Sequence, residues 1–304
     1  MDNCDASTNI NLSSLINGYT VFGEAEGFYS KILYLSSNVD KKKVAYKIFG
    51  PNMSHNSRCK EIRLHNIIEH DNIIKAYHVD AYGILMEYGV CMTYLNYKTM
   101  ADIYITISQI SMALEYLHIN NYIYFDLKAE NIVLVRDEYN DNKSLIKLID
   151  IGSCIHENNI YIDKEKNEFR RDSGIVYSKL YSSPEIIINK YKLSVQHDMW
   201  SLGVILSELA YNYHPYLNID MKSIDELRSS ASADALYRII IDNYRNETSI
   251  FPNNIINNNS HYSKLIDDFD TKPSEIIAKL VEYDPSKRLT SAQLLDLLYN
   301  LLSK

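Results

Sequence analysis

Residues 123–131 read IYFDLKAEN and place an acid, a base and an amide between positions 126 and 131. The carboxylate of Asp126 can accept the proton of a hydroxyl that attacks a phosphate, Lys128 can offset negative charge, and the amide oxygen of Asn131 can hold Mg²⁺. The aliphatic residues 132–135 follow at once and predict a short buried strand. The spacing therefore suits phosphoryl transfer. A match this short also arises by chance in about one chain in several hundred, so other parts of the chain have to support it.

The composition is that of a folded globular protein. Of 304 residues, 46% are hydrophobic and 23% are charged, and the length fits one large domain or two modest lobes. The net charge of -8 argues against a protein that binds nucleic acid mainly by neutralising phosphates. We therefore expect no direct nucleic-acid partner.

The four cysteines, Cys4, Cys59, Cys91 and Cys154, lie far apart and lack the paired spacing of zinc ligands. This pattern predicts reduced thiols in an intracellular protein. The first residues show no basic segment followed by an apolar run, and no later stretch reaches 18 uninterrupted apolar residues. We therefore expect a cytoplasmic location, with a nuclear one also possible, and no membrane partner. We also expect a monomer, although these features do not bear on the oligomeric state.

The N-terminal part predicts a hairpin after a polar lead-in. Residues 19–34 favour two strands joined across positions 23–30, a turn that resembles a phosphate-covering loop. Of the three glycines that such loops usually carry, only Gly27 is present, with Ala25 and Ser30 in the outer places. A plain hairpin without a ligand explains the stretch about as well.

Residues 44–49 alternate in the manner of a strand and place Lys47 on the face opposite Tyr46. The simpler interpretation of this lysine is an exposed strand face. The alternative is a lysine fixed against nucleotide phosphates and steadied by a carboxylate. Glu61 is a candidate for that carboxylate, in a helix predicted over about 57–69 whose apolar side is formed by Ile62, Leu64, Ile67 and Ile68.

The middle of the chain predicts a strand at 84–89 that runs into a glycine-loosened connector, and then a long helix at 101–118. The apolar side of this helix consists of Ile103, Ile107, Ile110, Leu114 and Leu117. His118 at its end suggests a capping or packing residue more than a catalyst. A further strand at 145–149 leads directly into Asp150, which is either part of an ordinary turn or a ligand of Mg²⁺.

The last part is helical after a long polar loop at 153–182. A mostly apolar helix contains Asp198 and Trp200, the only tryptophan, which we expect in the core. Asp198 is either an N-cap of this helix or a residue that binds the backbone of the 123–131 stretch. A terminal helix is expected to end at Leu302.

In their order along the chain these features resemble the eukaryotic-type protein kinase family, from about residue 19 to residue 302. Any one feature is a weak signal, whereas the whole series is specific. The matching motifs are Val44-Ala45-Tyr46-Lys47, Glu61 before His70, Leu117-His118, Asp126-Leu127-Lys128 with Asn131, Asp150-Ile151-Gly152, Ser183-Pro184-Glu185, Asp198 with Trp200-Ser201-Leu202-Gly203, and Asp284-Pro285 with Arg288-Leu289-Thr290.

The resemblance implies an α+β, bilobal fold with one catalytic domain at 18–304. A small antiparallel β lobe with one main helix would span residues 18–88, and a larger, mostly helical lobe would span 89–304, after a lead-in at 1–17. Lys128 follows Asp-Leu as in serine/threonine kinases, so the implied reaction transfers the γ-phosphate of ATP to Ser or Thr hydroxyls of protein substrates.

The resemblance also implies roles for individual residues. Lys47, paired with Glu61, would bind the phosphates of ATP, Asp126 would be the catalytic base, and Asn131 and Asp150 would hold Mg²⁺. The other residues implied in nucleotide binding are Met86 as gatekeeper beside the adenine, Glu87 and Tyr88 in the hinge, Ile32, Ala45 and Val133 as apolar walls, and Ala25 and Gly27 in the covering loop. Glu185 and Arg288 resemble the buried ion pair of the family.

Three departures from the family pattern affect the expected activity. Tyr124-Phe125 replaces the His-Arg pair before the base, so no cation stands there to bind a phosphorylated loop. We therefore predict activity without loop phosphorylation, so that Ser173→Ala and Ser178→Ala retain turnover. Ile151 replaces a phenylalanine, and the loop at 25–30 has fewer glycines for close approach to phosphates.

These departures leave a second functional class open, a pseudokinase that acts as a nucleotide-binding or scaffolding module. The presence of Lys47, Glu61, Asp126, Asn131 and Asp150 argues for the active enzyme, because phosphoryl transfer depends mainly on positioning and charge stabilisation. A small-molecule kinase is disfavoured because Ser183-Pro184-Glu185 and Arg288 belong to the protein-directed branch of the family.

Overall fold

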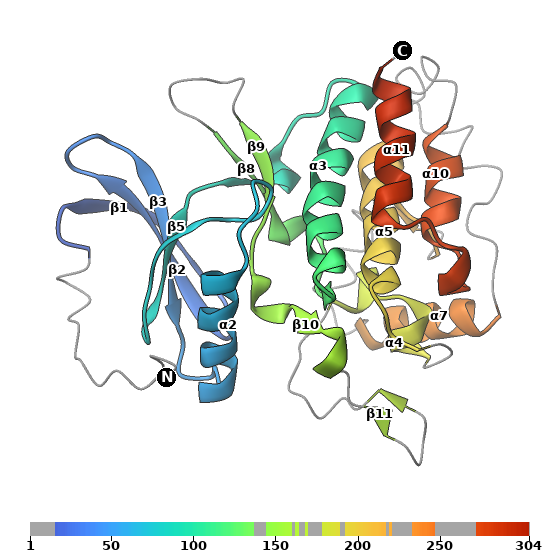
Figure 1. Cartoon of the computed structure of the whole chain (residues 1–304), viewed down its shortest axis with the longest axis horizontal. Helices are drawn as coiled ribbons and strands as arrows, with labels where there is room; N and C mark the ends of the chain where they lie inside the picture. Colours follow the sequence, from blue (N-terminus) through green and yellow to red (C-terminus); the bar gives the residue numbers. More distant parts are fainter. Residues whose placement is uncertain are drawn as a thin grey trace. The chain divides into compact units, whose positions relative to one another are not determined.

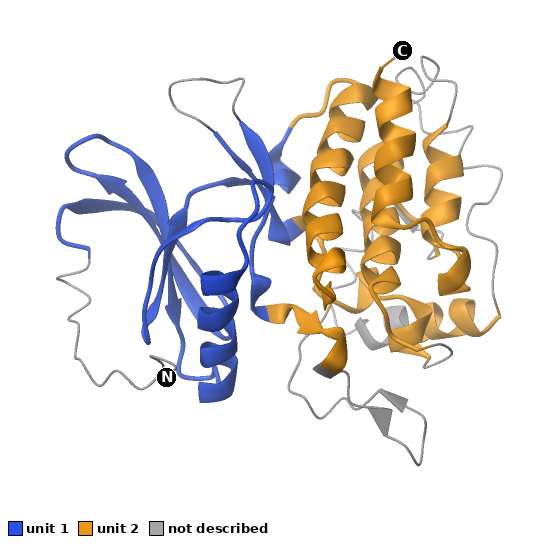
Figure 2. Ribbon diagram, viewed as in Figure 1, with its two compact units in different colours: residues 1–95, 130–152 blue, residues 96–129, 153–304 orange. Residues whose placement is uncertain are grey.

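Two separate stretches of the chain build each of two structural units (Figure 2). Unit 1 comprises residues 1–95 and 130–152, and unit 2 comprises residues 96–129 and 153–304. The computed structural model describes residues 16–136, 144–159, 162–163, 168–169, 178–188, 192–216, 219–220, 233–246 and 272–303 (Figure 1). Most of the expected lead-in, residues 1–15, lies outside these ranges, as do Cys4 and Ser173. The lobe boundaries 18–88 and 89–304 remain a prediction.

An antiparallel sheet of five strands forms the body of unit 1, in the order β1-β2-β3-β5-β4. The strands are β1 (Tyr19–Glu26), β2 (Ser30–Ser37), β3 (Lys43–Phe49), β4 (Ala76–Val79) and β5 (Gly83–Glu87). The predicted hairpin at 19–34 and the strands at 44–49 and 84–89 are thus confirmed. A core cluster packs Ile62 of helix α2 (His55–Ile67) against Ala45, Ile84 and Met86 of the strands. The expected antiparallel sheet with one main helix is therefore present.

Helix α2 begins two residues before the predicted start because Ser54 caps it, its hydroxyl accepting a hydrogen bond from the N–H of Ser57. Ile62 and Leu64 are buried as expected. The expectation for Ile67 is wrong, since this side chain is 53% exposed. It is the last residue of the helix, and the chain becomes extended at Ile68.

A smaller three-stranded sheet explains why residues 130–152 belong to unit 1. Its order is β6 (Val90–Cys91), β8 (Ile132–Val135) and β9 (Leu145–Leu148), all antiparallel. Strand β8 pairs Ile132 with Leu148, and Leu148 also bridges to Ile73 of the first stretch. The predicted strand at 132–135 is confirmed, and the strand predicted at 145–149 ends at Leu148.

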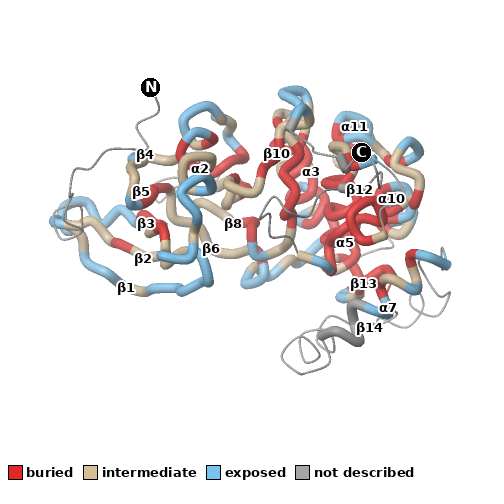
Figure 3. Tube along the Cα trace, turned by 90° about the horizontal axis from the view of Figure 1, so that it is seen from below, coloured by how far each residue is buried: buried red, intermediate tan, exposed pale blue. Residues whose placement is uncertain are grey.

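Helices dominate the described part of unit 2. They are α3 (Met100–Ile119), α4 (Pro184–Ile187), α5 (Gln196–Tyr211), α7 (Ala233–Arg245), α10 (Pro273–Leu280) and α11 (Ser291–Leu302). All five apolar residues predicted for one side of α3 are at most 1% exposed. Buried positions are concentrated along α3 and α5, which pack against α11 and α10 respectively (Figure 3). Trp200 of α5 is fully buried and stacks on Tyr216, as expected of a core residue.

Short strands and 3₁₀ turns complete the description. The paired strands are β7 (Tyr122–Ile123) with β10 (Ile155–His156), β11 (Ile162–Asp163) with β12 (Glu168–Phe169), and β13 (Tyr213–His214) with β14 (Ile219–Asp220). The 3₁₀ turns are η2 (Met92–Tyr94), η3 (Ala129–Asn131), η5 (Ile151–Ser153), η6 (Glu157–Asn159), η8 (Lys179–Tyr181) and η9 (Pro285–Lys287). No helix in the described ranges is both long and apolar enough to cross a membrane. In the described part of the chain, Cys59, Cys91 and Cys154 form no disulfide bond.

Candidate active site

Lys47 stands at the centre of a charged cluster in unit 1. Strand pairing places it in the middle of the sheet, opposite Ile32 of β2 and Ile84 of β5. Its Nζ lies 2.6 Å from an Oε of Glu61 and 2.7 Å from an Oδ of Asp150. Lys47 is only 8% exposed, so the simpler interpretation of a solvent-facing lysine is wrong. The structure thus brings together three of the residues predicted for nucleotide binding.

The charges of this cluster are set by burial and by one another. Burial acts to lower the pKa of Lys47, but the carboxylates of Asp150 and Glu61 outweigh it and hold this pKa above its usual value. Burial raises the pKa of Glu61, and the ammonium of Lys47 opposes that rise. The Asp150 side chain remains 42% exposed. One cation therefore faces two carboxylates, and the more exposed of the two, that of Asp150, is partly in contact with solvent.

Gly152 and the backbone at Asp150 explain how these side chains meet. A Cβ added at Gly152 would lie 2.7 Å from an Oε of Glu61, so only glycine leaves room for the buried carboxylate. Asp150 itself has φ of +55°, a left-handed conformation that non-glycine residues adopt rarely. Two positions of the Asp-Ile-Gly sequence are therefore constrained by the structure: Gly152 by the nearby carboxylate of Glu61, and Asp150 by its left-handed backbone. An ordinary turn would not require both.

Asn131 and Asp150, the two residues predicted to hold Mg²⁺, carry side-chain oxygens near the ends of neighbouring strands. The carbonyl of Asn131 accepts a hydrogen bond of 2.9 Å from the N–H of Ile149, next to Asp150. Within the described ranges, no group of three or more His, Cys, Asp or Glu side chains is arranged around a possible metal. Mg²⁺ usually takes only one or two protein oxygens and completes its shell with phosphate oxygens and water. One carboxylate and one amide oxygen from these two residues match that number and kind of protein ligands.

The apolar residues predicted around the adenine also belong to one cluster of unit 1. Ala45, Met86 and Val133 are members of a single buried core group, and Ile32 packs against it. Ala25 of β1 pairs with Ile32, and the N–H of Gly27 donates to the carbonyl of Ser30 at the turn. Gly27 does not have a positive φ. The turn therefore imposes no conformational need for glycine there.

Asp126 lies in unit 2, where both of its carboxylate oxygens are held. One Oδ is 2.6 Å from Nζ of Lys128, and the other accepts a hydrogen bond of 2.9 Å from the N–H of Ser178. Asp126 is 7% exposed. A carboxylate fixed at both oxygens, with a cation beside it, is oriented for proton transfer.

Asp198 shapes the backbone just before Asp126. Its carboxylate is fully buried and accepts hydrogen bonds from the N–H groups of Tyr124, at 2.8 Å, and Phe125, at 2.9 Å. His118 lies 2.9 Å from the same carboxylate. Of the two roles considered for Asp198, binding of the 123–131 backbone is confirmed and the N-cap is wrong, because Val195 occupies the cap position. His118 is correspondingly a packing residue.

Phe125 adopts a strained backbone, with φ of +77°, that its surroundings maintain. Its carbonyl lies 3.1 Å from Nε2 of His197, which also contacts Ser183. Its ring is 1% exposed and packs in an apolar cluster with Ile123, Ile155, Ile186 and Leu193. The side chain that replaces arginine is therefore a core residue of unit 2.

The predicted site residues divide between the units as follows. Unit 1 contains Ala25, Gly27, Ile32, Ala45, Lys47, Glu61, Met86, Glu87, Tyr88, Asn131, Val133 and Asp150, and unit 2 contains Asp126 and Lys128.

The family model described as protein kinase domain matches residues 23–299. The chain belongs to the protein kinase family. Among curated proteins, this kinase domain is similar to a probable serine/threonine-protein kinase PLK of Dictyostelium discoideum, with 29% identity over 62% of this chain and 19% of the relative. It is also similar to a putative serine/threonine-protein kinase of Acanthamoeba polyphaga mimivirus, with 26% identity over 90% of this chain and 59% of the relative.

A third relative is mitogen-activated protein kinase 13 of Arabidopsis thaliana, with 25% identity over 87% of this chain and 74% of the relative. The chain spans less than two thirds of the first relatives, 19% of the Dictyostelium kinase and 59% of the viral one. Membership of the family thus confirms the resemblance inferred from the motifs. What the longer relatives phosphorylate is a property of those proteins and is not transferred to this chain.

Sequence analysis missed a second buried lysine in unit 1 of this kinase domain. Nζ of Lys147 on β9 lies 3.0 Å and 2.8 Å from the two carboxylate oxygens of Glu87, and Lys147 is 7% exposed. Glu87 also accepts a hydrogen bond from the N–H of Lys75. The sequence did contain a feature that pointed to a buried lysine here, because Lys147 interrupts an apolar strand as Lys47 does. The pair joins the end of β5 to the strand that leads into Asp150.

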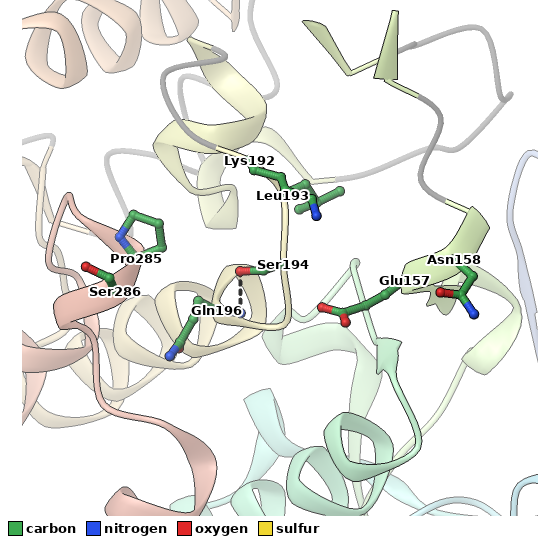
Figure 4. Close-up of a pocket in the computed structure, with 8 residues that line it drawn as sticks. All are labelled: Glu157, Asn158, Lys192, Leu193, Ser194, Gln196, Pro285 and Ser286. Carbon is green, nitrogen blue, oxygen red and sulfur yellow. Dashed lines mark hydrogen bonds between the residues drawn. The ribbon is translucent and has the colours of Figure 1, made fainter. Parts of the chain in front are cut away.

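A separate pocket of about 450 Å³ lies in unit 2 of the kinase domain (Figure 4). Glu157, Lys192 and Ser286 line it together with Gln196, whose N–H donates to Oγ of Ser194. Neither Asp126 nor Lys128 lines this pocket.

Proposed function

We propose that this kinase domain is an active protein serine/threonine kinase that transfers the γ-phosphate of ATP to Ser or Thr hydroxyls with Mg²⁺. The single observation that carries the proposal is the ion-pair cluster of Lys47, Glu61 and Asp150, with distances of 2.6 and 2.7 Å. A fixed cation beside a partly exposed carboxylate suits a nucleotide phosphate and its metal.

The roles of the residues follow from their chemistry. Lys47, held by Glu61, binds phosphate oxygens, and Asp150 and Asn131 would hold Mg²⁺, which neutralises charge on the phosphates when it is bound. Asp126 accepts the proton of the substrate hydroxyl, and Lys128 offsets negative charge that develops next to it. Apolar residues, among them Ala45 and Met86, exclude water from the adenine.

A pseudokinase is the second candidate, and specific residues favour it. Ala25 and Ser30 stand where glycines usually allow backbone N–H groups to approach phosphates, and Phe125 replaces an arginine. Retention of Lys47, Glu61 and Asp126 in the geometry described above favours the active enzyme.

The test is transfer of labelled phosphate from ATP to a generic basic protein by the purified full chain, beside Asp126→Asn. We expect label on serine and threonine, and a fall in kcat of about 10²–10⁴-fold in the variant with little change in nucleotide binding. Asp296→Asn, at an exposed position of α11, is the matched control and should keep the wild-type rate. Nucleotide binding without any transfer that depends on Asp126 would favour the pseudokinase.

A further inference from the structure

Three aromatic rings from separate elements of unit 1 pack together, and we call them the aromatic triad. Phe22 comes from β1, Tyr34 from β2, and Tyr88 from the segment directly after β5. The ring centroids of Phe22 and Tyr34 are 6.0 Å apart in a stacked arrangement. Tyr88 meets Phe22 at 5.5 Å and Tyr34 at 5.6 Å, both edge to face. Such pairs attract beyond the effect of burying area alone.

Two local features of β1 make this packing possible. The pairing of β1 with β2 shifts between Val21 and Gly23, which leaves Phe22 as the extra residue of a bulge. Bulges redirect side chains, often beside functional sites. A Cβ added at Gly23 would lie 3.1 Å from the ring of Tyr34, so the glycine gives that ring space. A plain hairpin would need neither feature.

The side chain of Lys43 contacts two rings of the aromatic triad. Nζ of Lys43 lies 5.6 Å from the ring centroid of Phe22 and 5.9 Å from that of Tyr88, within the range of cation–π attraction. Phe22 remains 46% exposed. Phe22 therefore meets the other rings at a partly open edge, where burial in a core does not explain its contact with them.

The position of the triad connects it with the proposed nucleotide site. Tyr34 packs against the same cluster as Ile32, the cluster that contains Ala45, Met86 and Val133. Tyr88 follows Glu87 in the segment proposed to contact adenine. Phe22 lies on the strand that continues to Ala25 and Gly27. The triad thus links the strand that enters the covering loop to the segment next to the adenine.

We propose that Phe22 and Tyr34 are positioning residues for ATP, which with Tyr88 hold β1 in place over the apolar walls. The inference rests on the proposed function. A loop with Ala25 and Ser30 in place of glycines offers fewer close N–H contacts to phosphates. Affinity for the nucleotide then depends more on a strand that is already held in its binding position, because less ordering is needed on binding.

The test compares Tyr34→Leu and Phe22→Leu with Tyr34→Phe in the full chain. We measure KM for ATP, kcat, thermal stability and the Kd of a fluorescent ATP analogue. Loss of a ring should raise KM and Kd about three- to tenfold with kcat within about twofold, whereas Tyr34→Phe keeps the ring and should match the wild type. Tyr77→Leu is the matched control, since Tyr77 is a partly exposed tyrosine of the same sheet with Lys42 4.6 Å over its ring.

The outcomes separate this inference from the proposed function. An unchanged KM and Kd in both leucine variants, or effects no larger than those of Tyr77→Leu, would overturn the positioning role while leaving transfer intact. A fall in kcat and in stability without a rise in Kd would overturn it too, in favour of a purely structural contact. If the wild type binds the analogue but transfers no phosphate, the proposed activity fails and the Kd values still decide the role of the triad. A wild type that binds no nucleotide overturns both.

Discussion

Each unit contains a buried cluster of a cation with carboxylates, and the two clusters are built in opposite ways. In unit 1, Lys47 is shared between Glu61 and Asp150, and the Asp150 side chain is 42% exposed. In unit 2, Arg288 and Glu185 form a bidentate pair at 2.6 and 2.8 Å, and both side chains have 0% exposure. The other three N–H bonds of Arg288 go to carbonyls of Gln196, Glu282 and Tyr283.

The difference indicates which cluster has capacity for a ligand. Arg288 uses all five of its donors within the protein and lies 4.9 Å from the ring of Trp200, so nothing remains to bind a further group. The unit 1 cluster has one more carboxylate than cations and a partly solvated aspartate. We infer that the sealed pair stabilises the fold and that the open cluster serves binding.

The largest effect is expected from breaking the sealed pair. Arg288→Met should lower the free energy of unfolding by about 3–5 kcal/mol, because Glu185 is left charged and fully buried. Chemical denaturation measures this change. Lys287→Met is the matched control, since Lys287 is 70% exposed, pairs with Asp284 only at 3.9 Å and should contribute below about 1 kcal/mol. Equal losses of unfolding free energy in the two variants would mean that the buried pair of Arg288 and Glu185 stabilises the fold no more than an exposed ion pair does.

Breaking the open cluster should mainly affect turnover. Lys47→Met should lower the rate about 10²–10³-fold, while the unfolding free energy changes by at most about 1–2 kcal/mol. Stability is spared because Asp150 reaches water, and burial already raises the pKa of Glu61, so that it can take up a proton. Transfer assays and denaturation on the same sample measure both. Lys31→Met is the control, at a lysine of the same sheet whose side chain is 41% exposed. If Lys47→Met lost as much stability as Arg288→Met, the proposed difference between a binding cluster in unit 1 and a stabilising pair in unit 2 would be wrong.

The sequence predicted these clusters unevenly. The hydrophobic period identified the buried side of α3, and the motif order identified Lys47, Glu61 and Asp150, because such patterns are local or shared by a family. The partnership of Lys147 with Glu87 depends on which strands become neighbours, and the pattern of either strand alone does not specify that. The same holds for Asp198, because the sequence was compatible both with a role as N-cap and with a contact to the 123–131 backbone.

Boundaries and exposure were predicted less well than element types. Helix α2 begins two residues before the start that the apolar pattern indicates, because Ser54 caps it. The apolar pattern does not reveal this start, since capping depends on one side-chain hydrogen bond. Ile67 has the right period but is the last residue of the helix, and it is 53% exposed. The bulge at Phe22 is a one-residue change of register, which no hydrophobic pattern reveals.

His65 offers a pH test of the open cluster, one turn beyond Glu61 on α2. Burial first, and then the charge of Lys47, lower the pKa of His65 to about 4. In the unfolded chain this histidine titrates near 6.5. Between these values the unfolded chain binds a proton that the folded chain does not, so the unfolding free energy should fall as the pH drops from about 6.5 to 4, by about 2–3 kcal/mol.

Denaturation of wild type and His65→Leu across this pH range measures the His65 contribution. The variant should lose stability less steeply, and Lys47→Met should also weaken the dependence. His78→Leu is the control, because His78 has 49% of its side chain exposed. Parallel curves for wild type and His65→Leu would show that His65 is not buried next to the cluster.

The smallest effect is expected from removing phosphate groups from the chain. Phe125 stands where the family has an arginine, and its side chain packs with Ile123, Ile155, Ile186 and Leu193, so the side chain at this position offers a phosphorylated loop no cation. The loop before Asp126 is instead held by Asp198 and His197. Phosphatase treatment, checked by mass spectrometry, should change turnover by less than about twofold.

Ser178→Ala should also be tolerated, because the contact of Ser178 with Asp126 uses its backbone N–H. A tenfold loss after dephosphorylation would mean that a cation elsewhere binds the phosphate, and Phe125 would then be a core residue without consequence for regulation.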